Sequence, residues 1–247
     1  MQLIAIFWYS VTYSFGAGIE VAKGIYVGGS LNYLSGKYEN NREYYEDDWD
    51  GNYTSPTDIN DPNTKNFNTF YFNDIISWNM NAWEMRFGFI VDWRDFARIG
   101  GSVKLPTKFD ITENYYLGGY SKFNNDYYID LVPSDSKIEY SIETPIEFTL
   151  GTSINLHLLN VSAQATFVDY SQLAFSGEID ESIISDNNRI MNSSLKSTLN
   201  LNLGTELKIP LTEIRLRAGA MYFPSPYRDD PQSFDKMFLT AGAGILA

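Results

Sequence analysis

Apolar and polar side chains alternate with a period of two along most of this chain, and that alternation limits the folds open to it. Residues 9–21 show it clearly, because every odd position is apolar or aromatic and every even position is Ser, Thr, Gly or Glu. Successive side chains of a β-strand point to opposite faces, so the pattern predicts strands with one apolar face. No amphipathic helix of convincing length competes with it. The pattern returns in residues 25–33, 83–91, 97–105, 138–150, 159–167, 195–209, 214–222 and 237–245.

The connections between these segments alternate in length. Short turns are predicted at residues 22–24, 92–95, 151–155 and 210–213, and long loops at about 39–73, 108–136, 169–192 and 224–236. All the long loops therefore leave one end of the sheet, an order that Greek-key sandwiches have no reason to keep. Outer-membrane barrels do keep it, with short periplasmic turns and long extracellular loops.

We therefore predict an all-β, antiparallel fold in a single domain over residues 1–247. It would be a partial up-and-down transmembrane β-barrel of about nine strands, with its apolar side facing lipid. The alternative is a soluble lipocalin-like or sandwich protein, which would turn the apolar side inward and carry more large charges on the other side.

The composition excludes several classes of function. The 18 Lys and Arg residues against 31 Asp and Glu leave a net charge of −13, the wrong sign for binding phosphate backbones, so no nucleic acid is expected as a partner. The chain has no Cys and one His, His157, which lies beside a predicted short turn and is read as a solvated turn residue. This composition excludes zinc sites with thiolate ligands, cysteine nucleophiles and most catalysis by imidazole groups. We expect no enzyme, no cofactor and no metal.

The charged residues of the predicted strands stand at the alternate positions that also carry the polar residues, so they share the polar face. One interpretation is a lumen filled by opposite charges that pair and hold water. The other is that a basic member, Arg215 or Arg217, contacts a substrate carboxylate during passage, with Glu143 also on the path. A two-carboxylate glycosidase is disfavoured, because residues i and i+4 of one strand lie ~13 Å apart. The set comprises Glu139, Glu143, Glu147, Arg98, Lys104, Lys196, Lys208, Arg215 and Arg217.

Two predicted loops carry unusual side chains. Residues 46–61 are dense in carboxylates but lack the spacing and the closing Glu of a calcium loop. We interpret them as a solvated acidic surface, with divalent cations shared with lipopolysaccharide as the alternative. The second loop is rich in aromatic residues, which would either line an apolar groove for a ligand or pack the loop and anchor it at the lipid interface. These residues are Tyr115, Tyr116, Tyr120, Phe123, Tyr127 and Tyr128.

Several short runs in the second half of the chain resemble one family. The strand end 167–173 (FVDYSQL), the strand 217–227 (RAGAMYFPSPY) and the run 240–244 (TAGAG) occur in order, and each piece alone is weak. Together they are similar to the FadL/TodX-type outer-membrane transporters of hydrophobic compounds. The resemblance implies a barrel of fourteen strands in the family, plugged by an N-terminal hatch, that takes up long-chain fatty acids or aromatic hydrocarbons. Neither a hatch motif nor the last strands are found here, so we expect a piece of such a barrel.

The function expected from these observations is outer-membrane transport of a hydrophobic small molecule, captured at extracellular loops and passed through the barrel. The expected partners are the substrate, the lipid bilayer and lipopolysaccharide, with the chain as a monomer. A general diffusion porin and a surface adhesin remain as alternatives. A wide pore without an apolar groove would favour the first, and surface binding without flux would favour the second.

Overall fold

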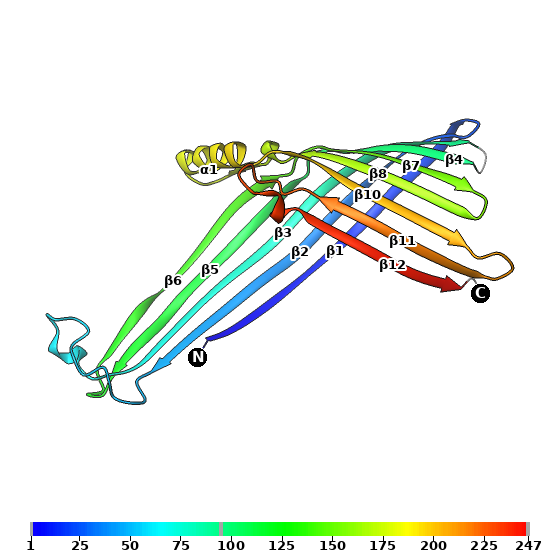
Figure 1. The fold of residues 1–247 in the computed structure, drawn as a ribbon. Coiled ribbons are helices and arrows are strands. Elements are labelled where there is room, and N and C mark those ends of the chain that lie inside the picture. Colours follow the sequence, from blue (N-terminus) through cyan, green and yellow to red (C-terminus); the bar gives the residue numbers. More distant parts are fainter. Residues whose placement is uncertain (1, 94–95, 246–247) are drawn as a thin grey trace. The chain divides into compact units, whose positions relative to one another are not determined.

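The computed structural model describes residues 2–93 and 96–245 and confirms the all-β class. Its strands form one twelve-stranded antiparallel sheet (Figure 1). The apolar N-terminal segment belongs to the first strand. The strands are β1 (Gln2–Ala22), β2 (Ile25–Asp47), β3 (Phe67–Trp93), β4 (Ala97–Lys104), β5 (Lys108–Phe123), β6 (Tyr128–Glu143), β7 (Glu147–Leu156), β8 (Leu159–Asp169), β9 (Ala174–Gly177), β10 (Ser197–Lys208), β11 (Ile214–Phe223) and β12 (Lys236–Ile245).

Twelve strands replace the predicted nine, because β5 lies where a loop was predicted and the predicted strand 138–150 is divided into β6 and β7. β4 is followed by β5, and β6 by β7, after interruptions of three residues that contain Pro106 and Pro145. Proline has no N–H to donate to a strand ladder, so regular pairing stops there. The backbone at the two interruptions is still paired, because the Thr144 N–H donates to the Thr107 carbonyl at 2.9 Å. The third additional strand is the four-residue β9.

Two of the predicted long loops have the wrong bounds, and the short turn predicted at 151–155 lies instead at residues 157–158, because β7 continues to Leu156. The loop predicted at 39–73 is shorter, because β2 continues to Asp47 and β3 begins at Phe67. The loop predicted at 108–136 is mainly the hairpin of β5 and β6, with its turn at residues 124–127. Aromatic residues on both parities, such as Tyr115 and Tyr116, hide the alternation there. The loop predicted at 224–236 agrees with the structure to within a residue at each end.

The segment 169–192 also holds more structure than a loop. It contains a 3₁₀ turn, η2 (Tyr170–Gln172), the strand β9 and the helix α1 (Glu181–Ser194). Asp180 caps α1, and its side chain accepts a hydrogen bond from the Ser182 N–H at 2.8 Å. None of the α1 residues is buried; the half-buried ones, such as Ile184 and Met191, lie on one side of the helix, and too few of them are apolar to give a clear helical pattern. Two other 3₁₀ turns are η1 (Pro62–Thr64) and η3 (Gln232–Phe234).

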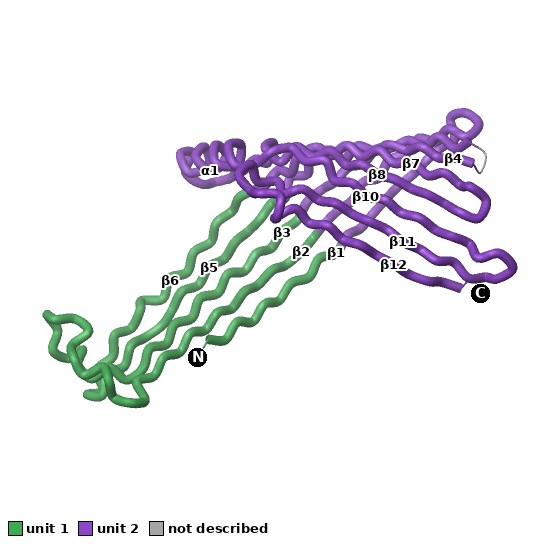
Figure 2. Tube along the Cα trace, viewed as in Figure 1, with its two compact units in different colours: residues 1–11, 35–81, 110–140 green, residues 12–34, 82–109, 141–247 purple. Residues whose placement is uncertain are grey.

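Among the described residues, no helix is long and apolar enough to cross a membrane. The chain forms two compact units, coloured separately in Figure 2. Unit 1 comprises residues 1–11, 35–81 and 110–140, and unit 2 comprises residues 12–34, 82–109 and 141–247. Unit 1 holds the β5–β6 hairpin and the loop 48–66. Unit 2 holds β4, β7, β8 and β10 to β12, together with the parts of β1 to β3 that pair beside them.

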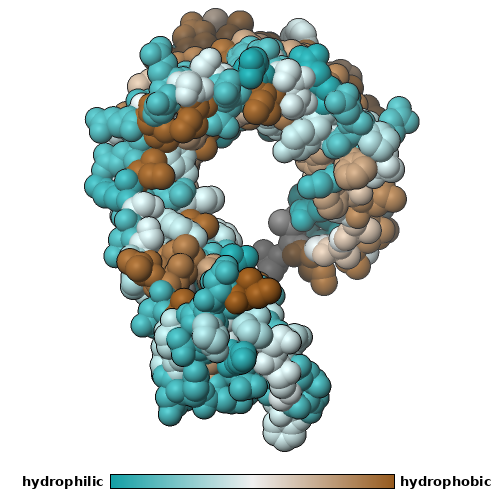
Figure 3. Space-filling view, turned by 90° about the vertical axis from the view of Figure 1, so that its left-hand side faces the viewer, coloured by the Kyte–Doolittle hydropathy of each residue, from teal (hydrophilic) through white to brown (hydrophobic). Residues whose placement is uncertain are grey.

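The sheet of unit 2 exposes its apolar side. Along β7 and β10 the apolar members, such as Leu150 and Leu203, are exposed, while the polar residues between them are mostly half-buried. Figure 3 shows hydrophobic patches among hydrophilic ones on the face that it presents. The lipocalin-like or sandwich alternative requires the opposite arrangement. The buried hydrophobic residues of the described chain are Ala82, Ile111, Phe123, Val168 and Leu195.

Candidate functional site

The polar face of unit 2 is hollowed and forms the first candidate site. A cavity of ≈ 790 Å³ is lined by residues of β3, β4, β7, β8, β10, β11 and β12, and a second of ≈ 480 Å³ is lined by residues of β1, β2, β3, β4, β7 and β8. Strand register brings Gly100, Gly151, Gln164 and Asn202 into one row across β4, β7, β8 and β10. Small and amide-bearing residues therefore line the middle of this face. Volumes of this size are typical of small-molecule sites.

A closed group of charges lies toward the loop end of this face. Glu84 of β3 accepts from Arg86 Nε at 2.7 Å and from the Asn32 amide at 3.1 Å. Lys104 Nζ lies 2.6 Å from Glu147 Oε1 and 3.8 Å from Glu84 Oε2. Two cations and two carboxylates balance, and Glu84 is only 8% exposed. We call Asn32, Glu84, Arg86, Lys104 and Glu147 the loop-end network.

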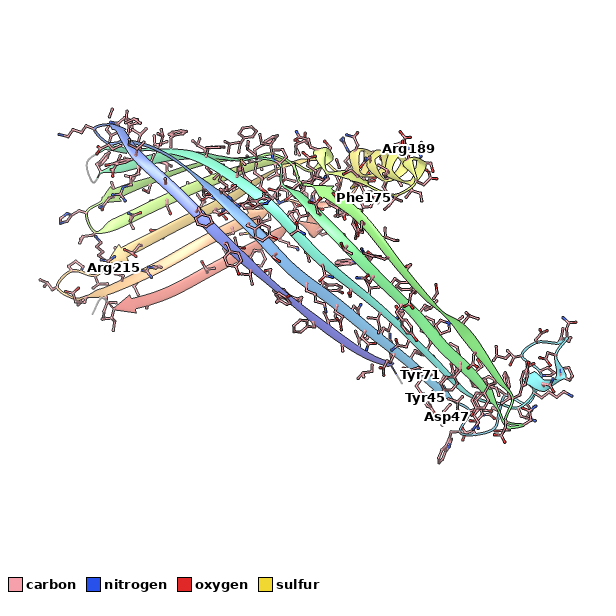
Figure 4. The ribbon with its side chains drawn as sticks, turned by 180° about the vertical axis from the view of Figure 1, so that it is seen from behind. Tyr45, Asp47, Tyr71, Phe175, Arg189 and Arg215 are labelled. Atoms are coloured by element: carbon pink, nitrogen blue, oxygen red, sulfur yellow. The ribbon has the colours of Figure 1, made fainter. Side chains whose placement is uncertain are left out.

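A second group lies near the short turn between β10 and β11. Glu206 of β10 accepts from Arg217 Nε at 2.7 Å and from Arg215 Nη1 at 3.0 Å. Figure 4 labels Arg215 close to this turn. Two guanidinium groups share one carboxylate, so the group carries a net positive charge. We call Glu206, Arg215 and Arg217 the turn-end network. Glu206 and Arg217 also line the larger cavity, together with Arg98, which pairs with Asp92 at 3.0 Å.

An uncharged belt separates the two networks. From Glu147 to Asn155 along β7, the side chains on the polar face are Thr149, Gly151 and Ser153. Eight residues of strand cover about 26 Å along the strand, slightly fewer than the roughly nine to eleven residues with which a tilted strand crosses a bilayer. The apolar face opposite carries Phe148, Leu150 and Ile154 over the same span. In the described part of unit 2, the two charged networks therefore lie on opposite sides of this belt.

The structure treats the predicted charged residues differently. It brings Arg215 and Arg217 together, and it joins Lys104 with Glu147. Glu143 is exposed at the end of β6, and the described contacts do not place it in either network. Glu139 lies in unit 1 and pairs with Lys137. Sequence reasoning missed Glu84 and Arg86, although both stand on the polar parity of residues 83–91 and could have been found by it.

The predicted aromatic loop cluster lies in unit 1, on β5 and the turn after it. Tyr115 and Tyr116 line a small cavity of ≈ 320 Å³. Tyr120 packs between Tyr71 and Tyr128, with ring centroids 5.6 and 6.2 Å away. Phe123 is 1% exposed, so it serves as packing rather than as ligand surface. Tyr127 donates from its hydroxyl to Asp61 at 2.9 Å. The cluster is thus split between packing and surface.

The acidic loop uses its carboxylates to organise its own backbone. Asp48 accepts from the Asn52 and Tyr53 N–H groups at 2.9 and 3.0 Å, and Asp58 accepts from Asn60 N–H at 2.9 Å. Within the described residues, no three His, Cys, Asp or Glu side chains are placed to hold a metal ion. His157 lies in the β7–β8 turn with a φ of 68°, as the turn interpretation expects.

The apolar face of unit 2 carries a groove of its own. Its volume is ≈ 650 Å³, and aromatic and aliphatic side chains line it almost throughout. Phe87 and Phe89 of β3, Phe148 and Leu150 of β7, and Phe167 of β8 form its sides, and all of them are exposed. In water such a surface would be costly, since exposed apolar area disfavours the folded state.

Comparison with known proteins supports the fold alone. No protein family matches the sequence, and no curated protein matches it either. Among solved structures, the chain is similar to the crystal structure of a Pseudomonas aeruginosa FadL homologue, with a TM-score of 0.58 and 14% sequence identity. The likeness covers 97% of this chain and 56% of that chain. The chain therefore has a FadL-like β-barrel fold and spans little more than half of that neighbour.

Proposed function

We propose that this chain is part of an outer-membrane β-barrel that passes hydrophobic compounds, such as long-chain fatty acids, across the outer membrane. The observation that carries the proposal is the inverted sheet of unit 2, with exposed apolar residues on one face and a hollowed polar face on the other. Lipid can cover the first face, and water and solute can occupy the second. The FadL-like fold agrees with this arrangement.

The two ends of the polar face would have different tasks. The short turns would lie on the periplasmic side, so the turn-end network would lie near the exit. Its spare positive charge can hold a substrate carboxylate, because guanidinium groups bind carboxylates through paired hydrogen bonds. Tyr115 and Tyr116 of unit 1 would contact the substrate on the outer side, with the loops exposed to lipopolysaccharide. No covalent chemistry and no cofactor are needed, and the chain would act as a monomer.

A general diffusion porin is the second candidate, and one observation favours it. The belt of Thr149, Gly151 and Ser153 between the networks is polar and small, as a water-filled path for hydrophilic solutes would be. The two candidates differ in what they pass. A porin would pass small sugars at rates that fall with size, whereas a transporter for hydrophobic compounds would raise the uptake of fatty acids above that of sugars.

A matched pair of substitutions tests the membrane location. Leu203 and Asn202 are neighbours on β10, on the apolar and the polar face respectively. In a membrane, Leu203→Arg should cost about 2–4 kcal/mol of stability, while Asn202→Arg should cost far less, because only the first places a charge in lipid. Urea unfolding in lipid vesicles measures both. Equal costs, or a larger cost for Asn202→Arg, would contradict the proposal.

Uptake assays test the transport step. Cells that export the chain to the outer membrane should accumulate labelled oleate faster than cells with an empty vector, and the gain should exceed that for a labelled disaccharide. A larger gain for the disaccharide would select the porin. No gain for either solute, despite confirmed insertion, would contradict both.

A further inference from the structure

The loop 48–66 in unit 1 is a folded element rather than a flexible connection. Thr64 is 1% exposed, and its hydroxyl donates to the Asp61 carbonyl at 2.7 Å and accepts from the Asp58 N–H at 3.0 Å. The Phe67 N–H donates to the Tyr53 carbonyl at 3.1 Å, closing the loop at its base. A loop whose polar groups are satisfied internally keeps one shape. Any pocket it forms is therefore largely preformed.

The same loop is tied to the turn between β5 and β6. The Tyr127 hydroxyl donates to Asp61, and Asn125 Nδ2 donates to the Asn63 carbonyl at 3.1 Å. Hydrogen bonds from the Asn63 backbone N–H and from the Tyr127 hydroxyl hold the pKa of the Asp61 carboxyl below its usual range. The hydrogen bond to Asp61 in turn raises the pKa of Tyr127. At neutral pH Asp61 is a carboxylate and Tyr127 is a neutral phenol, so the hydrogen bond between them is present.

Between this loop and the ends of β2, β3 and β5 lies a pocket of ≈ 640 Å³, which we call the tip pocket. Figure 4 shows Asp47 and Tyr71 near this end of unit 1. Tyr53, Phe67 and Phe70 supply aromatic surface, and Phe123 lies behind Phe67 with its ring centroid 6.2 Å away. The lining also includes hydroxyl, amide and carboxylate groups. They come from Glu46, Asn52, Thr54, Ser55, Thr57 and Ser121.

The lining excludes several kinds of ligand. Among the described residues that line the pocket there is no lysine or arginine, so a carboxylate or phosphate has no counter-charge. Glu46 is on its rim, and Asp47, Asp48 and Asp50 follow it in sequence, so anions are repelled. A plain acyl chain would leave the polar groups without partners, unlike the groove beside Phe87 and Phe148.

A neutral sugar satisfies both parts of the lining. A pyranose ring has an apolar C–H face, which packs on an aromatic ring, and hydroxyl groups at its edge, which donate to and accept from hydroxyl, amide and carboxylate groups. We propose that the tip pocket binds one or two units of a neutral glycan. A quaternary ammonium ligand would use the rings and Glu46, but it would leave the five hydroxyl and amide side chains without a role.

The test uses the full chain in a detergent without a sugar head group, so that the detergent does not compete. Saturation-transfer NMR is recorded with glucose-, galactose-, mannose- and N-acetylglucosamine-based neutral trisaccharides, and with a sialylated trisaccharide, octanoate and choline as competitors of other classes. At least one neutral trisaccharide should give transfer. The sialylated trisaccharide, octanoate and choline should bind more weakly than that trisaccharide or not at all.

Three variants separate the pocket from nonspecific adhesion. Tyr53→Ala keeps the backbone hydrogen bonds of the loop and should weaken the sugar about tenfold, because it removes an aromatic face. Trp49→Ala is the matched control, since Trp49 lies in the same loop, is 89% exposed and does not line the pocket. It should leave binding unchanged. Glu46→Gln should leave sugar binding within about threefold, because the glutamine side chain can still accept a hydrogen bond from a sugar hydroxyl.

The inference is overturned if no neutral trisaccharide binds, if Tyr53→Ala binds as the unchanged chain does, or if choline or octanoate binds more tightly than every sugar. None of these outcomes bears on oleate uptake, so this inference and the transport proposal stand or fall separately.

Discussion

The two charge networks of unit 2 share one face of one sheet but differ in balance and exposure. In the loop-end network every carboxylate meets a cation and every cation a carboxylate, and Glu84 is buried. In the turn-end network Glu206 is shared by two arginines, and the Arg217 side chain is 60% exposed. Burial makes an uncompensated charge expensive, while exposure lets a spare charge find a partner from outside. We therefore propose a structural role for the first network and a ligand-binding role for the second.

The largest effect is expected from Glu84→Ala. The change removes a buried carboxylate and leaves Arg86 without its partner and Lys104 with Glu147 alone. The loss should cost about 2 kcal/mol, because the buried Asn32 amide loses its acceptor and the half-exposed Arg86 loses its ion pair. The free energy of unfolding, measured by urea titration in lipid vesicles, should fall by that amount.

Glu206→Ala is the matched control for this prediction, since it also removes a carboxylate shared by two cations. Arg217 is exposed to solvent, so the loss should be about 1 kcal/mol or less. Equal losses for Glu84→Ala and Glu206→Ala would remove the distinction between the two networks.

Double-mutant cycles sharpen the same comparison at the level of single pairs. Lys104 and Glu147 are register partners on β4 and β7, and the Lys104 side chain is 16% exposed. Their coupling energy should be about 1–2 kcal/mol, as for other charge pairs with little solvent. Arg217 and Glu206 are register partners on β10 and β11, and their coupling should be about 0.5 kcal/mol because water screens the arginine. A larger coupling for the second pair would contradict the assignment.

Much of this arrangement was open to prediction from the sequence, and the exceptions have physical causes. Period-two alternation predicted the fold class and the apolar outward face, because strand geometry turns parity directly into faces. It placed Arg215 and Arg217 together correctly on the polar face. It failed at β5, where Tyr115 and Tyr116 occupy both parities, and at α1, none of whose residues is fully buried. Where buried and exposed residues do not alternate along the strand, the sequence shows no period of two that would predict it.

The candidate sites were harder to predict than the faces. The alternation of polar and apolar residues predicts one shared face for Glu84, Arg86, Lys104 and Glu147. Their contact in one network depends in addition on the register of β3 against β4 and of β4 against β7. The tip pocket depends on hydrogen bonds across long stretches of sequence, such as Tyr127 to Asp61. Such contacts follow from how the loop closes, which local patterns do not encode.

The smallest effect on stability, and the most informative one on function, is expected from Arg217→Ala. The folded state should lose less than about 1 kcal/mol, since the side chain is exposed. Uptake of a fatty acid should fall about fivefold, because a charge-assisted hydrogen bond to the carboxylate is lost, while uptake of the fatty alcohol of equal length should not change. Arg98→Ala, whose arginine is already neutralised by Asp92, should alter neither rate. An equal fall for acid and alcohol would mean that Arg217 shapes the path without recognising charge, and the turn-end network would then have the structural role of its counterpart.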